Sequence, residues 1–260
     1  MRVLSLFSGG GLGDYGLELA GMEIVAQCEI DPYCQKILQL RWPDVPKWRD
    51  IREVKGDELP QCDLISGGFP CQDISIAQND PDGIAGERSG LWKEQLRLIR
   101  TIRPRYALIE NVSALLVRGL GSVLRDLASI GYDAEWQVIS SAQVGNFHRR
   151  KRVWILAYPK SQRWKEVAFQ GILNPEILSS KPSEWKRLLS YPTRNDYSIE
   201  RWKEIEDLVC GNDDGDTQQV DRLHVLGNGQ QVQVVEWVGR RILEADRAMT
   251  PEKLREGVST

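Results

Sequence analysis

Apolar runs alternate with amphipathic stretches through the first 158 residues. Six short runs have the composition and the flanking residues of buried strands: Val3–Phe7, Glu23–Glu29, Asp63–Ser66, Tyr106–Glu110, Ala134–Ser140 and Arg152–Tyr158. Helical spacing of apolar residues lies between them, in Asp31–Arg41, Leu91–Ile102 and Ala114–Ile130, and another helix opens at Asp14. This alternation predicts a doubly wound α/β domain, in which helices cover both faces of a parallel sheet.

The alternation stops after Tyr158 and resumes near the end of the chain. Prolines interrupt the segment that follows, at Pro159, Pro175, Pro182 and Pro192. Order returns around Val220–Arg222, and Val232–Leu243 has the apolar spacing of a closing helix. We therefore expect a main domain over residues 1–158, a small lobe over 159–221, and a return to the main domain over 222–260.

Composition and charge narrow the class of protein. A chain of 260 residues with 41% apolar content can bury a sizeable core. No apolar run approaches the roughly 20 residues that span a bilayer, and the first strand follows Arg2 without a cleavage site, so we expect a cytoplasmic protein. The net charge of -3 argues against a wholly basic nucleic-acid binder.

Charge is nevertheless segregated along the chain. Arg149–Lys165 carries seven Lys or Arg residues and no acid, whereas Glu204–Asp221 carries seven acids and no Lys or Arg. A basic run beside aromatic residues suits a phosphate backbone, but it suits a solvated surface equally well.

The cysteines indicate neither a disulfide framework nor a metal site. Their number is odd, and none forms a Cys-x-x-Cys pair or lies near a cluster of His ligands, so we expect no bound metal. Cys28, Cys34 and Cys62 lie in or beside apolar patterns and are expected to be buried and inert.

A glycine-rich turn follows the first strand in "LFSGGGLGDYGLELAG". Glycines let the backbone approach a ligand closely, and the helix N-terminus favours polar or anionic groups. The run from Gly11 to Gly16 satisfies G-x-G-x-x-G, and Glu29 ends the next strand, where a partner for ribose hydroxyls is expected. A nicotinamide dinucleotide and S-adenosylmethionine both carry such a ribose, and a tight turn that needs glycine for packing is a third interpretation.

Three kinds of chemical group are expected at one edge of the sheet. Cys71, in "GGFPCQDIS", follows the strand Asp63–Ser66, and ligands of open α/β sheets bind beyond the carboxyl ends of strands. Glu110 is the first polar residue after the next apolar run, and Arg150 and Arg152 share one face of a later strand. A nucleophilic thiol, a carboxyl that can hold a proton and a guanidinium thus converge on one cleft.

In this arrangement the chain resembles the DNA (cytosine-5) methyltransferases, whose motifs it carries in order. "FSGGG" is similar to the first cofactor motif and "GGFPCQDIS" to the Pro-Cys catalytic motif. "RSGLW" resembles the motif after the mobile loop, "ENV" the cytosine-binding Glu motif, and "HRRKRVW" the Gln-x-Arg-x-Arg motif. "LGNGQQVQVVEWV" resembles the closing motif. The resemblance covers nearly the whole chain outside about 159–221.

The resemblance implies a Rossmann-like domain that binds S-adenosyl-L-methionine, with a small target recognition lobe at 159–221. Glu29 would bind the ribose, and Asp50 and Ile51 would contact adenine. The implied cofactor residues are Phe7, Ser8, Gly9, Gly10, Gly11, Leu12, Glu29, Ile30, Asp50, Ile51, Gly68, Pro70, Leu91 and Asn228.

The resemblance also implies a mechanism. Cys71 would add to C6 of cytosine, Glu110 would bond N3 and the exocyclic amine, and Arg152 with Arg150 would hold O2. C5 would then accept the methyl group. These atoms cannot be reached inside a duplex, so the base must be flipped out, and Gln72–Ser89 would close over it.

Two departures and several alternatives accompany the resemblance. His148 stands where the family has Gln, and Val232 where a Pro often follows the closing Gly-Asn. The resemblance implies double-stranded DNA as the partner and no association with a membrane. A cognate restriction endonuclease is compatible with the resemblance to compact bacterial and phage-borne members. We expect a monomer. A nicotinamide oxidoreductase, a tRNA-cytosine methylase and a non-enzymatic DNA-binding homologue remain as alternatives. The Cys-Phe-Thr signature of the tRNA enzymes is absent.

Overall fold

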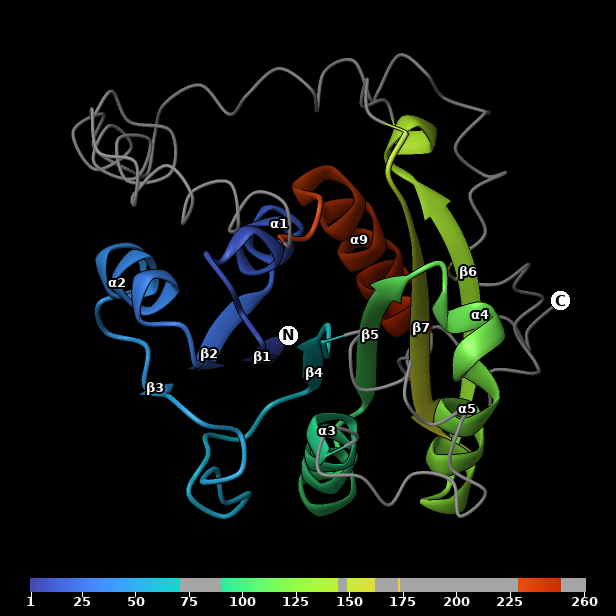
Figure 1. The fold of residues 1–260 in the computed structure, drawn as a ribbon, viewed down its shortest axis with the longest axis horizontal. Coiled ribbons are helices and arrows are strands. Elements are labelled where there is room, and N and C mark those ends of the chain that lie inside the picture. The colour runs from blue at the N-terminus through green and yellow to red at the C-terminus, as the bar shows by residue number, and fades with distance from the viewer. Residues whose placement is uncertain (71–89, 145–148, 162–172, 174–228, 249–260) are drawn as a thin grey trace, which may run out of the picture.

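The computed structural model describes residues 1–70, 90–144, 149–161, 173 and 229–248. They form a seven-stranded sheet in the order β3-β2-β1-β4-β5-β7-β6, with helices on both faces (Figure 1). Two predicted site residues, Cys71 and Asn228, lie outside the described residues, as do His148, the segment 72–89 and most of the lobe 159–221. No helix in the described ranges is long and apolar enough to cross a membrane.

The strands and helices follow the predicted alternation. The strands are β1 (Arg2–Leu6), β2 (Glu23–Cys28), β3 (Lys47–Trp48), β4 (Leu64–Gly67), β5 (Tyr106–Val112), β6 (Tyr132–Ser140) and β7 (Lys151–Pro159). The helices are α1 (Leu12–Leu19), α2 (Pro32–Arg41), α3 (Gly90–Ile102), α4 (Leu115–Arg118), α5 (Leu120–Ser129), the 3₁₀ helix η3 (Ser141–Val144) and α9 (Val232–Ala248).

The sheet is mixed, so the prediction of a parallel sheet was wrong for one strand. β1, β2, β3, β4 and β5 pair in parallel, but β7 is inserted between β5 and β6 and runs antiparallel to both. Only residues 141–150 join β6 to β7, and a parallel connection needs a longer crossover. The predicted helix at 114–130 is two helices that meet at Gly119, and the two-residue β3 was not predicted.

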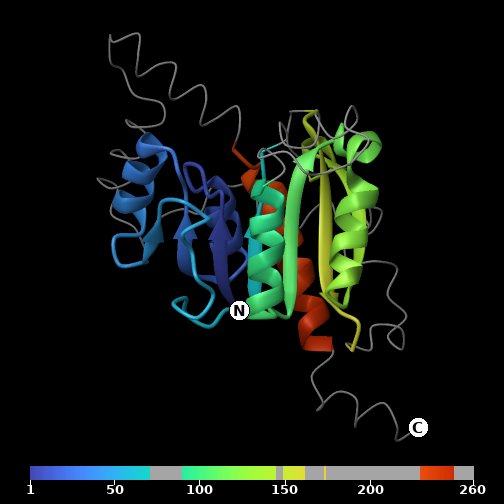
Figure 2. The same ribbon diagram turned by 60° about the horizontal axis from the view of Figure 1, so that its bottom comes forward.

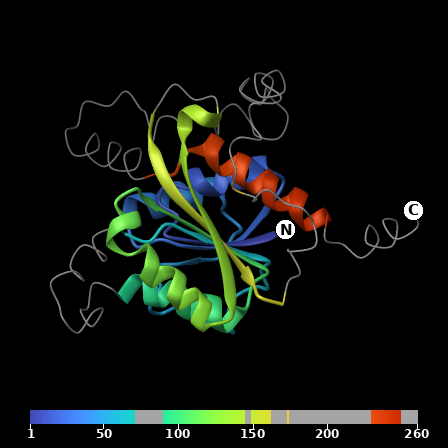
Figure 3. The same ribbon diagram turned by 90° about the vertical axis from the view of Figure 1, so that its right-hand side faces the viewer.

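Alternate residues of the strands enter two separate apolar cores. Leu4, Ile65 and Ile109 belong to the core under α3 and α5, whereas Val3 and Leu64 belong to the core under α1 and α9. Figure 3 shows the two layers on opposite faces of the sheet, and Figure 2 shows α3 in front of the sheet and α9 behind it. The strands β1, β2, β4, β5 and β7 are buried on both faces over most of their length, which explains why their apolar runs are nearly continuous.

Helices α1 and α9, distant in sequence, pack closely on one face of the sheet because glycines lie where they touch. A Cβ on Gly16 of α1 would lie 2.7 Å from the carbonyl oxygen of Val232 and 2.7 Å from Cβ of Val235. A Cβ on Gly239 of α9 would lie 2.8 Å from Cβ of Ala20. These glycines therefore bring the end of the chain against the helix that follows the glycine-rich turn.

Replacing Gly16 by Ala should destabilise the protein by about 1–3 kcal/mol, because a rigid backbone oxygen and a Cβ must move to admit the methyl group. The matched control is Gly121→Ala in α5, where nothing lies within 4 Å of the added Cβ. That change should stabilise the helix by up to about 1 kcal/mol, since Ala has the higher helix propensity. Urea unfolding measures both, and equal effects of the two substitutions would contradict the close packing of α1 and α9.

Candidate active site

The glycine-rich turn at the end of β1 has a backbone that few residue types can adopt. Phe7, Gly9 and Gly11 have φ values of 55°, 55° and 78°, all in the left-handed region. The amide of Ser8 donates to the carbonyl oxygen of Cys28, at the end of β2, over 3.1 Å. A side chain at Gly11 would collide with the ring of Trp42. The turn is thus tied to the end of β2. The positive φ of Phe7, a non-glycine residue, is a sign of local strain.

Glu29 lies directly after β2 and is fixed by two backbone amides. Gly9 donates to Oε2 over 2.7 Å, and Asp31 donates to Oε1 over 2.8 Å. Each carboxylate oxygen keeps a lone pair after accepting one hydrogen bond. The side chain therefore stands at the mouth of the turn as an oriented acceptor for hydroxyl groups.

A buried hydrogen-bond network lies beneath the turn. Asp14 accepts from Ser5 Oγ over 2.5 Å and from Gln27 Nε2 over 2.7 Å, and the hydroxyl groups of Ser5 and Ser8 lie 2.8 Å apart. Burial raises the pKa of Asp14 to about 6, although both hydrogen bonds act to lower it. Sequence reasoning placed Asp14 only at the start of a helix, because its partners come from β1 and β2 and no local pattern reveals them.

Glu110 and Arg152 form an ion pair at the ends of β5 and β7. The Nε of Arg152 lies 2.9 Å from Oε1 of Glu110. Val112 pairs with Arg152 across the two strands, so Glu110 is a diagonal neighbour of Arg152 on the same face. Burial raises the pKa of Glu110 to about 7, and the charges of Arg152 and Arg150 act against that rise. The carboxyl group can thus hold or release a proton near neutral pH.

The chain that leads from β4 toward Cys71 is held by its neighbours. The Nδ2 of Asn111 donates to the carbonyl oxygen of Phe69 over 3.0 Å. The Phe69 ring lies 5.3 Å from the ring of Trp92 in α3. Asn111 follows Glu110 on β5, so the same strand carries the acid and fixes the approach to the cysteine.

One cavity of about 480 Å³ joins the glycine-rich turn to the ion pair. Its lining includes Asp14 and Asp31 on one side and Glu110, Asn111 and Arg152 on the other. It lies beyond the carboxyl ends of β1, β4 and β5, where the order of an open α/β sheet reverses. Six of the predicted cofactor residues line it: Phe7, Ser8, Gly9, Glu29, Gly68 and Pro70.

The other predicted cofactor residues that the structure describes do not line this cavity. They are Gly10, Gly11, Leu12, Ile30, Asp50, Ile51 and Leu91. Ile30 is 57% exposed beside Glu29, whereas Ile51 is buried in the core. Sequence reasoning also missed a lining residue, Gln230, whose side chain occupies the space that a Cβ on Gly13 would need. Gln230 is the second residue after the Gly-Asn of the quoted closing motif, so that motif carried the signal.

The thiols within the described ranges are held in the protonated form or buried. Burial raises the pKa of Cys28 to about 12 and that of Cys62 to about 11. Cys34 is buried and lines the cavity. In the described part of the chain no group of three or more His, Cys, Asp or Glu side chains is arranged to hold a metal ion.

The chain is similar over most of its length to known proteins of one family. A family model described as C-5 cytosine-specific DNA methylase matches residues 1–243. Type II methyltransferase M2.BsuMI of Bacillus subtilis is 38% identical over 191 residues, which are 70% of this chain and 48% of the relative. Type II methyltransferase M.Sau3AI of Staphylococcus aureus is 37% identical over 140 residues, 50% of this chain and 34% of the relative. The chain thus spans less than half the length of either.

Solved structures share the fold at lower identity. A mutant of DNMT2 from Spodoptera frugiperda superposes with a TM-score of 0.54 at 18% identity, over 65% of this chain and 53% of that one. The methyltransferase EhMeth of Entamoeba histolytica gives a TM-score of 0.52 at 20% identity, over 63% of this chain and 54% of that one. The fold is therefore the Rossmann-like one of these methyltransferases.

Replacing Glu110 by Gln should change how stability depends on pH. The folded-state pKa of Glu110 is raised from 4.5 to about 7, so folding favours the protonated carboxyl, and the free energy of unfolding falls as pH rises through this window. Gln does not titrate. The free energy of unfolding of Glu110→Gln relative to the parent should therefore increase by about 3 kcal/mol between pH 4 and pH 8.

Urea unfolding at several pH values measures this difference. Asp14 titrates in both proteins and cancels from it. A flat difference for Glu110→Gln would show that folding does not raise the pKa of its carboxyl.

Proposed function

The chain belongs to the C-5 cytosine-specific DNA methylase family, and from that premise we propose that it transfers a methyl group from S-adenosyl-L-methionine to C5 of cytosine in duplex DNA. The observation that carries the proposal is the single cavity that contains Glu29 at one end and the Glu110–Arg152 pair at the other. The Glu29 carboxylate suits the hydroxyl groups of a ribose, and the Glu110–Arg152 pair suits the hydrogen-bonding edge of a nucleobase. The strand that leads to Cys71 passes between them.

The residues present fit the proposed cofactor. A cavity of about 480 Å³ lies within the usual range for small-molecule sites. Glu29 would accept hydrogen bonds from ribose hydroxyls while two backbone amides hold it in place. The turn at Phe7, Ser8 and Gly9 would lie against the ligand. S-adenosyl-L-methionine supplies a methyl group made electrophilic by its sulfonium.

The chain's own groups would activate the cytosine. C5 is a weak nucleophile, so a thiolate of Cys71 would add to C6 and place electron density on C5. Protonated Glu110 would donate to N3, and its second oxygen would accept from the exocyclic amine. Arg152, with Arg150, would donate to O2. A pKa of about 7 suits Glu110 to this task, since it can donate a proton to N3 and later recover it.

The target and its partners follow from the same proposal. The base must leave the duplex to reach the cavity, and we assign closure over it to 72–89 and sequence recognition to the lobe 159–221. The basic residues of the run Arg149–Lys165 other than Arg150 and Arg152 would contact phosphates. We further propose that the protein acts in the cytoplasm as a monomer, with a cognate restriction endonuclease as its partner in the cell.

S-adenosyl-L-methionine should bind to the protein and NAD should not. Glu29→Ala should weaken cofactor binding at least about tenfold, because two ribose hydrogen bonds to a charged acceptor are lost. The control is Glu23→Ala at the exposed start of β2, which should leave affinity unchanged. Titration calorimetry measures all of these. Binding of NAD without a response to S-adenosyl-L-methionine would instead support an oxidoreductase.

After methyl transfer, C5 would lose its proton and the Cys71 thiolate would leave C6, which releases 5-methylcytosine and the free enzyme. Duplex DNA that carries 5-fluorocytosine should therefore trap a covalent complex when the cofactor is present, because its C5 carries fluorine instead of a proton that can be removed. Cys71→Ser should abolish trapping, and Cys62→Ser should not, since burial keeps the Cys62 thiol protonated. Denaturing electrophoresis detects the complex. Trapping that survives Cys71→Ser or depends on Cys62 would mean that the nucleophile is misassigned.

A further inference from the structure

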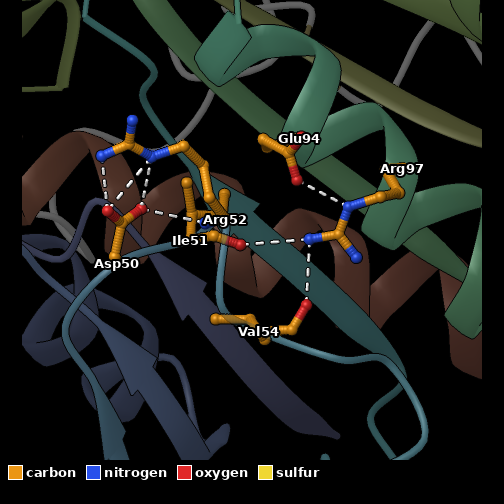
Figure 4. A network of polar contacts seen from close by, with 6 residues as sticks. All are labelled: Asp50, Ile51, Arg52, Val54, Glu94 and Arg97. Carbon is orange, nitrogen blue, oxygen red and sulfur yellow. Dashed lines mark hydrogen bonds and ion pairs between the residues drawn. The ribbon is translucent and has the colours of Figure 1, made fainter.

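One side chain of helix α3, that of Arg97, binds the backbone of the turn that contains Asp50 and Ile51. The Nη2 of Arg97 donates to the carbonyl oxygen of Ile51 over 3.1 Å and to that of Val54 over 2.9 Å (Figure 4). Glu94, one turn earlier on α3, lies 2.6 Å from Nε of Arg97 and orients the guanidinium. Hydrogen bonds from a charged donor to backbone carbonyls are among the stronger ones in proteins.

The side chains of Ile51 and Val54 anchor the turn in the core under α3, but among the described residues it has few other polar attachments. Its backbone closes on itself through hydrogen bonds from Glu53 to Asp50 and from Val54 to Ile51. The Ile51 side chain enters the core. Arg52 pairs with Asp50 across two carboxylate oxygens, but the Arg52 side chain is 67% exposed, so this pair contributes little. Arg97 is therefore the main polar tie between this turn and the rest of the domain.

The same helix holds the strand end that precedes Cys71. The Nε2 of Gln95 donates to the carbonyl oxygen of Gly67, the last residue of β4, over 3.3 Å. Gln95 is fully buried. The Trp92 ring, also on α3, packs against Phe69. The segments 50–54 and 67–69 thus both contact the same helix.

We propose that α3 fixes two segments of the site relative to each other: Arg97 positions the turn 50–54, to which the resemblance assigns the adenine contact, and Gln95 positions Gly67, which lines the cavity ahead of Cys71. This inference rests on the proposed function. Both are positioning residues, because neither lines the cavity. Without Arg97 the turn samples more conformations, and ligand binding must select the competent one, which lowers apparent affinity in proportion to its population.

Substitutions of the two residues should change different kinetic constants. Arg97→Met should raise the Kd and KM for S-adenosyl-L-methionine about tenfold and leave kcat within about twofold, because saturating cofactor restores the turn. Arg97→Lys keeps a cationic donor and should give an intermediate Kd. Gln95→Leu, of similar volume, should lower kcat about tenfold and leave Kd unchanged, because it loosens the strand before Cys71.

The matched control is Arg100→Met, since Arg100 lies on the same helix and is exposed. It should change neither constant. Calorimetry gives Kd, methyl transfer to duplex DNA gives KM and kcat, and thermal unfolding shows whether each variant is folded. Should Arg97→Met fail to fold, the raised Kd of Arg97→Lys carries the test.

A Kd for Arg97→Met and Arg97→Lys equal to that of Arg100→Met would overturn the proposal, even with a lower Tm, since that result describes a structural role alone. The same applies if Gln95→Leu raises Kd instead of lowering kcat. Failure of the proposed function would show in the parent protein, which would then bind no S-adenosyl-L-methionine. Failure of the present proposal would show only in the variants.

Discussion

Burial of the Glu110 carboxyl beside a guanidinium is the interaction on which the site depends. In water this group would be ionised near neutral pH and could only accept hydrogen bonds. Enclosure at the end of β5 raises its pKa to about 7, and Arg152 at 2.9 Å, together with Arg150, limits that rise. The balance leaves a carboxyl group that can donate to a ring nitrogen and release the proton again. Either influence alone would fix the group in one state.

The topology of the sheet brings this acid to the same cavity as the glycine-rich turn. β1 lies between β2 and β4, and β4 lies between β1 and β5. The chain therefore diverges in both directions from the boundary between β1 and β4, and the helices that follow leave a crevice at the carboxyl ends. Glu29 approaches that crevice after β2, and Glu110 from β5. The strand orientation thus supplies the site, and Gly229 and Gln230, just before α9, complete its lining.

Much of the domain could be predicted from the sequence because most of its strands, β6 and β3 excepted, are buried on both faces. Continuous apolar runs located β1, β2, β4, β5, β6 and β7, and the first polar residue after the fifth-strand run located Glu110 at the cavity. The direction of β7 could not be read from its residues, since an apolar run has the same pattern in either direction. The length of its connection to β6 was the available signal.

Contacts between distant segments account for the rest. The bonds of Asp14 to Ser5 and Gln27, and of Arg97 to the carbonyl oxygens of Ile51 and Val54, join residues that share no local pattern. Their side chains looked like ordinary polar residues of amphipathic helices. The raised pKa values of Asp14 and Glu110 likewise depend on enclosure that only tertiary packing creates. A sequence can thus indicate which residues reach a sheet edge, but not how strongly each is desolvated there.

The most direct test of the account is to identify the product. Duplex DNA would be incubated with the protein and S-adenosyl-L-methionine labelled in its methyl group, digested to nucleosides and separated by chromatography with mass detection. The account predicts label in 5-methylcytosine and in no other nucleoside. Absence of labelled 5-methylcytosine, or label on the exocyclic nitrogen of cytosine instead, would contradict it.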